Sequence, residues 1–404
     1  MNNPISTTTL EVATPSAAVS TTRSTAKRLK HHHDTAEDHY HHQSLLPGLP
    51  DHIAQLCLSL VPPSLLFSVC HSWRRLIYSP SFPEFLSLYA IFLPTETQSN
   101  PSNSIEFCSF DPISCKWQPL PPPPLDPPLH FLFRHPSFIS RKLPIQSVAV
   151  AGNLVVLAAT KDQFLPALSR PLVFNPLSKK WVLGPPLSTP RRWCAAGASR
   201  GSIYVASGIG SHYNIDVARS VEKWDLNTPP QQRQHRWRWE KMGKLKDGKF
   251  SRDAIDAVGW RGKLCMVNVK GDARKEGIIY DVETDSWEEM PEGMVSGWRG
   301  PAAGMEEEII YVVDESKGSL KKYDPVKDAW VEVVENELLK GAQHVTAARG
   351  KVCILCADGL SIAVVDVAAP PPVRRLWVVD VPGRSQVLAI HILPRLSHSD
   401  SHFD

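Results

Sequence analysis

A pair made of an aromatic residue followed by Asp or Asn recurs along the chain, and a tryptophan follows it after a fixed interval. In four copies the tryptophan comes six residues after the acid or amide: Phe110-Asp111 with Trp117, Phe174-Asn175 with Trp181, Tyr280-Asp281 with Trp287, and Tyr323-Asp324 with Trp330. Two irregular copies, Trp224-Asp225 with Trp239 and Val365-Asp366 with Trp377, contain eight and five extra residues. A period of about fifty residues built from short strands predicts a β-propeller with one blade per copy.

Each residue of the repeat has a structural role in such a blade. Asp or Asn beside a hairpin turn accepts a hydrogen bond from the backbone about two residues on and so stabilises the turn. The aromatic residue and the tryptophan supply the large apolar area that joins one four-stranded blade to the next. We therefore predict that these tryptophans are structural and do not bind a partner.

The two ends of the β region predict how the ring closes. Residues 385–394 have the pattern of a first strand with no blade after it, and residues 89–93 have the pattern of a second strand with no first strand before it. Pairing these two strands completes the first blade and removes exposed edges. We predict a mainly β fold: a six-bladed propeller over residues 89–395 that is kelch-like by its period, then a flexible tail at 396–404.

The segment 44–86 predicts a small all-α module before the propeller. Pro50 suits the start of a first helix, whose apolar residues share one face: Ile53, Leu56, Cys57 and Leu60. After Pro62-Pro63, apolar residues between 65 and 77 keep helical spacing, and Ser79-Pro80 ends the second helix. A segment of about forty residues buries little surface, so we expect part of its apolar surface to be an interface.

Residues 1–43 are rich in Ser, Thr and His and contain few large apolar side chains, so we expect them to be disordered. The six histidines between His31 and His42 are either solvated low-complexity chain or a loose site for a transition metal. Lys27-Arg28-Leu29-Lys30 is either a nuclear import signal or a chance cluster. Glu11 and the lack of an amphipathic arginine pattern disfavour an organelle transit peptide. We expect the protein in the nucleus, the cytoplasm or both.

Composition disfavours several classes of protein. The net charge of +3 is close to balance, so neither nucleic acid nor an anionic membrane surface is expected as a partner. No apolar run reaches eighteen residues, which predicts a soluble protein. The eight cysteines are scattered and no secretory signal is visible, which favours a reduced, intracellular protein. Cys353-x-x-Cys356 lies in a strand pattern without a second pair, so we interpret it as core packing rather than half a zinc site.

The sequence contains no recognisable catalytic or cofactor motif. Phosphate-binding glycine loops, the Gly-x-Ser-x-Gly elbow, the His-Glu-x-x-His helix and the EF-hand loop are all absent from it. Glu306-Glu307-Glu308 is interpreted as a solvated turn, and the histidines of the β region are isolated. We expect no catalytic residue, no cofactor and no metal site.

Two features mark candidate residues for binding a target. The loop at 207–219 is the longest connection between second and third strands, and it carries His212, Tyr213 and Arg219. An arginine recurs near the start of first strands, which line the channel of a propeller, and Trp298 precedes one of these arginines: Arg192, Arg252, Arg299 and Arg384. Around the channel mouth they would either hold carboxylates or phosphates of a peptide or make hydrogen bonds between blades. The insertion at 227–238, on the opposite face, is either an exposed variable loop or a second docking element.

Two blocks in the helical segment have a specific pattern. Leu49-Pro50-Asp51 opens the segment, and Val69-Cys70-His71-Ser72-Trp73-Arg74-Arg75-Leu76 lies near its end. Together they resemble the F-box, a helical motif that docks on the Skp-type adaptor of cullin-RING ubiquitin ligases. An F-box followed by kelch blades is similar to the plant F-box/kelch-repeat proteins, including the group known as Skp-interacting partners. The chain departs from the family at His52, where an acidic residue is common, and in its lack of Gly-Gly doublets, which only Ser207-Gly208 approaches.

This resemblance implies a function and a set of residues. By position, seven residues would dock on the adaptor or hold the F-box helices together: Leu49, Pro50, Ile53, Val69, Cys70, Trp73 and Leu76. The protein would be the non-catalytic substrate-recognition subunit of an SCF-type ubiquitin ligase, with the propeller binding the target protein. The alternative is a propeller enzyme or small-ligand sensor with the helices as a structural cap. The two blocks favour the first interpretation, because a cap does not require them.

Overall fold

The computed structural model describes residues 44–93, 105–125, 129, 145–158, 168–191, 193–227, 237–248, 250, 255–268, 276–369, 375–383 and 385–397. The chain divides into two units, Met1–Ser44 and Leu45–Asp404, and the described helices and strands belong to the second. The predictions for residues 1–43, for most of the insertion at 227–238 and for most of the tail at 396–404 lie outside the described residues.

Three short helices begin the second unit: α1 (Asp51–Ser59), α2 (Pro63–Phe67) and α3 (His71–Tyr78). The sequence predicts one helix where the structure has α2 and α3. Cys70 adopts an extended backbone, with φ −154° and ψ 167°, and this separates the two helices. We call residues 45–85 the helical module. Its core consists of six buried side chains: Leu58, Leu66, Leu76, Ile77, Tyr78 and Phe82.

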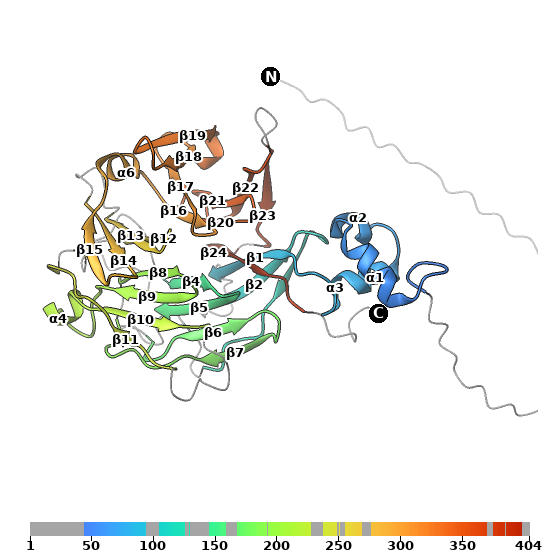
Figure 1. The fold of residues 1–404 in the computed structure, drawn as a ribbon, viewed down its shortest axis with the longest axis horizontal. Helices are drawn as coiled ribbons and strands as arrows, with labels where there is room; N and C mark the ends of the chain where they lie inside the picture. The colour runs from blue at the N-terminus through green and yellow to red at the C-terminus, as the bar shows by residue number, and fades with distance from the viewer. Residues whose placement is uncertain are drawn as a thin grey trace, which may run out of the picture. The chain divides into compact units, whose positions relative to one another are not determined.

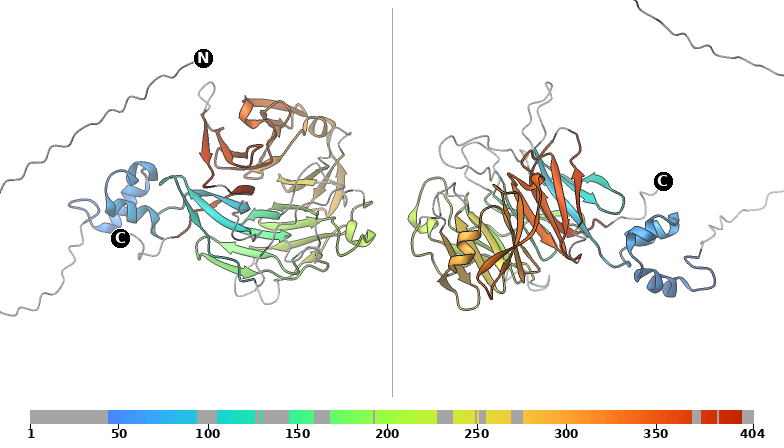
Figure 2. Two further views of the ribbon diagram at one scale, coloured as in Figure 1. Left: turned by 180° about the vertical axis from the view of Figure 1, so that it is seen from behind. Right: turned by 90° about the horizontal axis from the view of Figure 1, so that it is seen from above.

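Six four-stranded sheets follow, which confirms the predicted six-bladed propeller (Figures 1 and 2). Blades 1 to 3, each listed from its innermost strand, are β24 (Gln386–Pro394), β1 (Leu86–Leu93), β2 (Glu106–Asp111) and β3 (Lys116–Pro119); β4 (Gln146–Val150), β5 (Asn153–Ala158), β6 (Leu172–Asn175) and β7 (Lys180–Leu183); and β8 (Ala195–Ser199), β9 (Ser202–Ala206), β10 (Val221–Asp225) and β11 (Glu240–Lys241).

Blades 4 to 6 have the same order and are antiparallel throughout. They comprise β12 (Ile255–Trp260), β13 (Lys263–Asn268), β14 (Gly277–Asp281) and β15 (Ser286–Glu289); β16 (Ala302–Met305), β17 (Ile309–Asp314), β18 (Ser319–Asp324) and β19 (Ala329–Glu335); and β20 (His344–Ala348), β21 (Lys351–Leu355), β22 (Ser361–Asp366) and β23 (Leu376–Asp380).

The ring is closed by its C-terminal strand. β24 pairs with β1 in antiparallel register, and Leu88 lies opposite Ile392. Pairing of the last strand with the first blade is therefore confirmed. It leaves neither strand as an exposed edge inside blade 1, because β24 is innermost and β1 is flanked by β24 and β2.

The acid or amide of the repeat stabilises its hairpin, as predicted. In all six copies its side chain accepts a backbone N–H two or three residues on: Asp111 from Ile113 (2.9 Å), Asn175 from Ser178 (2.8 Å), Asp225 from Asn227 (2.9 Å), Asp281 from Glu283 (2.9 Å), Asp324 from Val326 (3.0 Å) and Asp366 from Ala368 (3.2 Å). In the four regular copies the aromatic residue lies directly opposite the tryptophan in the ladder.

Five tryptophans join neighbouring blades through their indole N–H groups. Each donates to a carbonyl at the end of the preceding blade or in the connection that leaves it, over 2.7–3.0 Å: Trp117 to Asp380, Trp181 to Pro121, Trp239 to Pro185, Trp287 to Gly243 and Trp330 to Met294. A buried indole needs such a partner. The predicted structural role is therefore confirmed for these five tryptophans.

The sixth copy differs from the prediction. Leu376 lies opposite Val365, and Trp377 lies opposite Val364. Because side chains alternate between the faces of a sheet, this shift of one residue turns the indole of Trp377 away from the position that the other tryptophans occupy. Trp377 is 41% exposed, while Leu376 packs against the core. The prediction that Trp377 is equivalent to the other tryptophans is therefore wrong.

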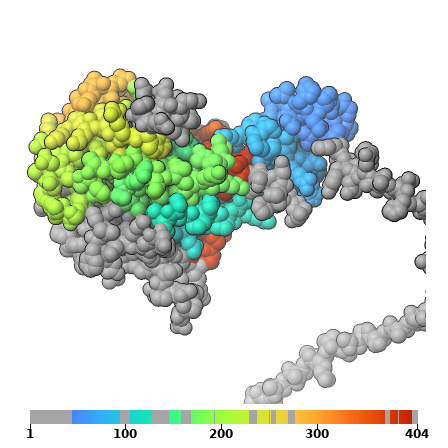
Figure 3. All heavy atoms as spheres, turned by 90° about the horizontal axis from the view of Figure 1, so that it is seen from below, coloured from blue at the N-terminus to red at the C-terminus, as the bar shows by residue number. Residues whose placement is uncertain are grey.

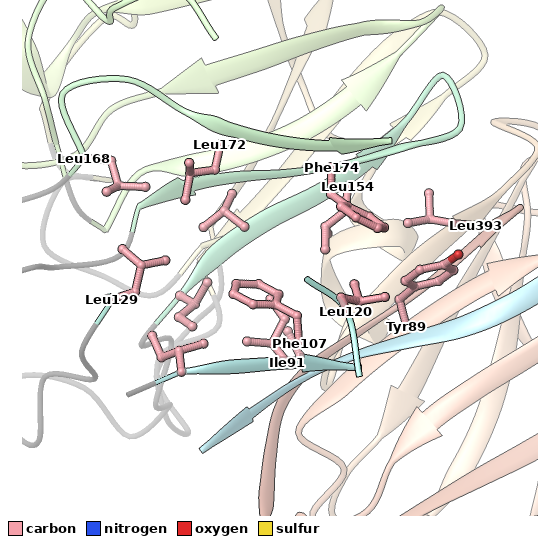
Figure 4. Close-up of a cluster of buried hydrophobic side chains, with 14 of the residues drawn as sticks. Tyr89, Ile91, Phe107, Leu120, Leu129, Leu154, Leu168, Leu172, Phe174 and Leu393 are labelled. Atoms are coloured by element: carbon pink, nitrogen blue, oxygen red, sulfur yellow. The ribbon is translucent and has the colours of Figure 1, made fainter. Parts of the chain in front are cut away.

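Apolar side chains fill the spaces between blades. Figure 4 shows one cluster, in which Tyr89 and Phe107 of blade 1 meet Leu154 and Phe174 of blade 2. In the space-filling view of Figure 3, side chains of neighbouring blades lie directly against one another. Each blade buries both faces against its neighbours, and this mutual burial is the main source of the stability of the ring.

Candidate functional site

The helical module exposes an unusual amount of apolar surface for its size. Six of its residues have exposed apolar side chains: Leu49 (40%), Ile53 (38%), Leu56 (64%), Leu60 (87%), Leu65 (59%) and Val69 (57%). We call these six residues the exposed apolar face. In α1 the buried residues are Ala54 and Leu58, so the predicted stripe of Ile53, Leu56 and Leu60 turns toward solvent. An apolar surface of this kind marks an interaction site.

The seven predicted adaptor-binding residues fall into two groups. Leu49, Pro50, Ile53, Val69 and Cys70 are exposed at the surface. The other two hold the module together: Leu76 is buried in its core, and the Nε1–H of half-buried Trp73 donates to the carbonyl of Leu45 over 2.8 Å. Leu56, Leu60 and Leu65 were not among the seven, although the helical spacing of Leu56 and Leu60 with Ile53 indicates the same face.

The loop between β9 and β10 contains a short helix, α4 (Ile215–Ala218), which the sequence did not predict. Asn214 caps α4 by accepting the backbone N–H of Asp216 over 2.8 Å. The predicted residues His212 and Tyr213 are exposed just before it. Arg219 has another role, because its Nε–H donates to the carbonyl of Leu245 over 2.8 Å and ties this loop to the next connection.

Buried Arg191 anchors the base of the same loop and was missed by the sequence reasoning. Its guanidinium forms an ion pair with the buried carboxylate of Glu222 on β10 and donates to the carbonyl of Ser207 over 3.2 Å. Glu222 also accepts the hydroxyl of Ser188 over 2.7 Å. Nothing in the sequence distinguishes Arg191 from its neighbour, because burial depends on the packing of three separate segments.

The predicted ring of arginines is only partly described. Arg192, Arg252 and Arg384 lie outside the described residues, while Arg299 is exposed in the connection before β16. Trp298 is fully buried, and its ring packs edge to face on Trp330 with 5.9 Å between centroids. The prediction that the Trp298 side chain stands at the channel mouth is therefore wrong. It fills the space between blades 4 and 5 instead.

The innermost strands enclose a cavity of about 350 Å³ along the channel. Small residues line much of it, including Gly197, Gly259 and Gly304 at matching positions of blades 3 to 5. A methyl group on Gly259 would lie 2.0 Å from the carbonyl oxygen of Ala198, and one on Gly304 would lie 2.6 Å from that of Gly259. These glycines are therefore required for the close approach of the innermost strands.

The turn at Glu306-Glu307-Glu308 contacts three other blades, which corrects its interpretation as a solvated turn. Glu307 accepts the hydroxyl of Ser199 over 2.9 Å and the N–H of Arg200 over 2.7 Å. Glu306 accepts the N–H of Arg349 over 2.6 Å, and the carbonyl of Glu308 accepts Trp260 Nε1–H over 3.1 Å. The turn of blade 5 therefore links blades 3, 4 and 6 at one end of the channel.

Two histidines face each other along the channel wall. The rings of His344 on β20 and His391 on β24 pack edge to face with 5.7 Å between centroids. His391 Nε2 lies 2.8 Å from the hydroxyl oxygen of Ser147. Burial, with a smaller effect of His344, lowers the pKa of His391 to about 3. His391 is therefore neutral near pH 7 and contributes a hydrogen bond rather than a charge.

The described part of the chain shows no group of three or more His, Cys, Asp or Glu side chains that could hold a metal ion. Cys353 and Cys356 are both buried, which supports their interpretation as core residues. Burial raises the pKa of Cys353 to about 12, so its thiol stays protonated at neutral pH. Within the described ranges, no helix is long and apolar enough to cross a membrane.

Comparison with known proteins gives two informative relatives. The chain is 55% identical to the F-box/kelch-repeat protein SKIP25 of Arabidopsis thaliana over 361 residues, which cover 88% of this chain and 90% of that protein. It is 24% identical to the F-box protein AFR of Arabidopsis thaliana over 341 residues, 80% of this chain and 83% of that protein. No family model matches the chain.

Proposed function

Because the chain belongs to the F-box/kelch-repeat family, we propose that it is the substrate-recognition subunit of an SCF-type E3 ubiquitin ligase. The family and the propeller fold support the role of a substrate receptor. In this proposal the helical module docks on a Skp-type adaptor and through it on a cullin-RING ligase. The propeller binds the target protein, and the protein acts in the nucleus, the cytoplasm or both.

The exposed apolar face is the observation that carries the adaptor part of the proposal. Leu60 is 87% exposed and Leu56 is 64% exposed, while Leu66 in the same module is fully buried. Leaving such side chains in water has a free-energy cost that burial against a partner removes. An adaptor that covers this face gives these leucines a role that the packing of the module does not explain.

The target part of the proposal rests on the exposed loops of the propeller. His212, Tyr213 and Arg299 lie in connections at the ends of blades opposite to the β2–β3 hairpin, because strands in each blade alternate in direction. The helical module contacts that hairpin through Tyr78 and Asp111. The candidate target surface and the adaptor surface are therefore attached to opposite ends of the strands, which allows both partners to bind at once.

The proposed chemistry is proximity rather than catalysis by this chain. Holding a target close to a ubiquitin thioester carried by another subunit raises the effective concentration of its lysines. The arrangement requires no nucleophile, general base or cofactor in the receptor. It requires two binding surfaces on one scaffold.

Adaptor binding by matched surface variants tests the proposal. Leu60→Asp in the full-length chain is expected to weaken binding of a purified Skp-type adaptor by at least about tenfold, because a charge replaces a docking leucine. Val326→Asp is the control, since Val326 is 92% exposed in a propeller hairpin. It is expected to bind like the unmodified chain. Equal affinity of the Leu60→Asp and Val326→Asp variants would contradict the proposal.

A further inference from the structure

The end of α3 is joined to blade 1 by a buried side-chain cluster. Tyr78 is 4% exposed, and its ring packs edge to face on Phe67 of α2 and Phe85, with centroid distances of 6.4 and 6.0 Å. Its hydroxyl donates to the carboxylate of Asp111, the acid of the first repeat copy. Asp111 thus serves both its own hairpin and the helical module.

Arg395 reaches the same place from the other end of the chain. It directly follows β24, and its backbone N–H donates to the carbonyl of Phe85 over 2.9 Å. The guanidinium is buried and donates to the carbonyls of Tyr78 over 3.1 Å and Ser79 over 2.7 Å. It also lies over the ring of Phe85, 5.4 Å from the centroid.

These two carbonyls belong to the C-terminal end of α3, where helical carbonyls lack partners within the helix. A cation at this end also interacts favourably with the helix dipole. The helical module alone has only six buried core residues, so it depends on contacts of this kind. Arg395 reaches α3 only when β24 pairs with β1, because the residue follows β24 directly.

We propose that Arg395 is a positioning residue for adaptor docking: closure of the propeller by β24 caps α3 and stabilises the exposed apolar face. The adaptor part of this inference rests on the proposed function. A chain whose ring is open then has a loosened helical module and binds adaptor weakly. Only completely folded receptors dock efficiently.

Hydrogen exchange of backbone amides in the full-length chain tests the cap directly. Arg395→Met is expected to speed exchange in α3 by at least about tenfold, because two charge-assisted hydrogen bonds are lost. Amides of β17, on distant blade 5, are expected to change by less than about twofold. Arg395→Lys, which keeps the charge, restores part of the protection, and unchanged exchange in α3 of Arg395→Met overturns the proposal.

A matched control and a second variant keep the result interpretable. Arg200→Met removes an exposed arginine that pairs with Glu283 and is expected to leave α3 unchanged. If Arg395→Met loosens the propeller as well, Tyr78→Phe decides, because it removes only the hydrogen bond to Asp111. Faster exchange in α3 of Tyr78→Phe with unchanged β17 supports the proposal, and no change in α3 overturns it.

Adaptor affinity separates this inference from the proposed function. Arg395→Met is expected to bind a purified Skp-type adaptor about tenfold more weakly than the unmodified chain, with partial rescue in Arg395→Lys. If the unmodified chain does not bind the adaptor, the proposed function fails while the exchange result still decides whether Arg395 caps α3. If Arg395→Met binds as tightly as the unmodified chain, its role as a positioning residue is wrong.

Discussion

The propeller and the helical module treat apolar side chains in opposite ways. In the propeller, large aromatic residues such as Trp224 and Tyr280 are fully buried between blades. In the helical module, six apolar residues face solvent and six are buried. The difference indicates that the first is a self-sufficient scaffold, whereas the second is a small domain shaped for contact with another protein.

The two regions meet at a residue that belongs to both patterns. Asp111 occupies the same repeat position as Asp281 and Asp324, which stabilise their own hairpins. Only Asp111 of these three also accepts a hydroxyl from the helical module. The regular scaffold therefore acquires a specific attachment point through Tyr78, a residue outside the repeat.

The largest expected effect is on the propeller. Trp330→Ala is expected to lower the free energy of unfolding by about 3–5 kcal/mol, because it removes a large ring packed between blades. Trp377→Ala is expected to cost about 1 kcal/mol or less, since this indole is 41% exposed. Thermal and denaturant unfolding measure both. Similar losses for the two variants would contradict the register shift in blade 6.

Two adjacent leucines sharpen the contrast within the helical module. Leu66→Ala is expected to cost about 2–5 kcal/mol, because Leu66 is fully buried. Leu65→Ala is expected to change stability by about 0.5 kcal/mol or less, since Leu65 is 59% exposed. Amide exchange of α1 to α3 reports on both variants. A large loss of protection in Leu65→Ala would mean that the exposed apolar face is structural.

The pH dependence of stability separates buried from exposed histidines. The pKa of His391 is about 3 in the folded protein because of burial, and that of an unfolded histidine is about 6.5. Between these values the unfolded state binds more protons, so stability decreases as the pH falls. The slope from His391 is at most about 1.4 kcal/mol per pH unit.

The substitution His391→Gln is expected to flatten the decrease in stability between pH 6.5 and 3, measured by denaturant unfolding across this window. The control is His212→Gln, which changes an exposed histidine and should leave the slope as it is. An unaltered slope in His391→Gln would show that other groups cause the pH dependence.

The smallest expected effect concerns the turn at Glu306-Glu307-Glu308. Glu307→Ala is expected to cost about 1–2 kcal/mol, because Ser199 and the N–H of Arg200 lose a charged acceptor. Glu283→Ala removes a mostly exposed carboxylate that pairs with Arg200 and is expected to cost about 0.5 kcal/mol or less. Equal losses in unfolding experiments would mean that the turn contributes no more than a surface ion pair.

Several features of the candidate surfaces followed from sequence pattern, and others did not. The exposure of Leu49, Ile53 and Val69 agrees with their expected place in the module. The burial of Trp298 was not visible in the sequence, because it depends on contact with Trp330 of the next blade. The role of Arg191 was missed for the same reason, since its carboxylate partner lies on β10.

Sequence alone determined the blade count, the closing strand and the family resemblance, because hairpin turns and local spacing are short-range properties of the chain. Only the tertiary structure decided which stripe of α1 faces solvent, which way Trp377 turns and where Arg395 binds. Arg395 and Tyr78 are 317 residues apart in sequence. Their contact arises from closure of the ring, and no local pattern encodes a hydrogen bond between two ends of a chain that meet only when it has folded.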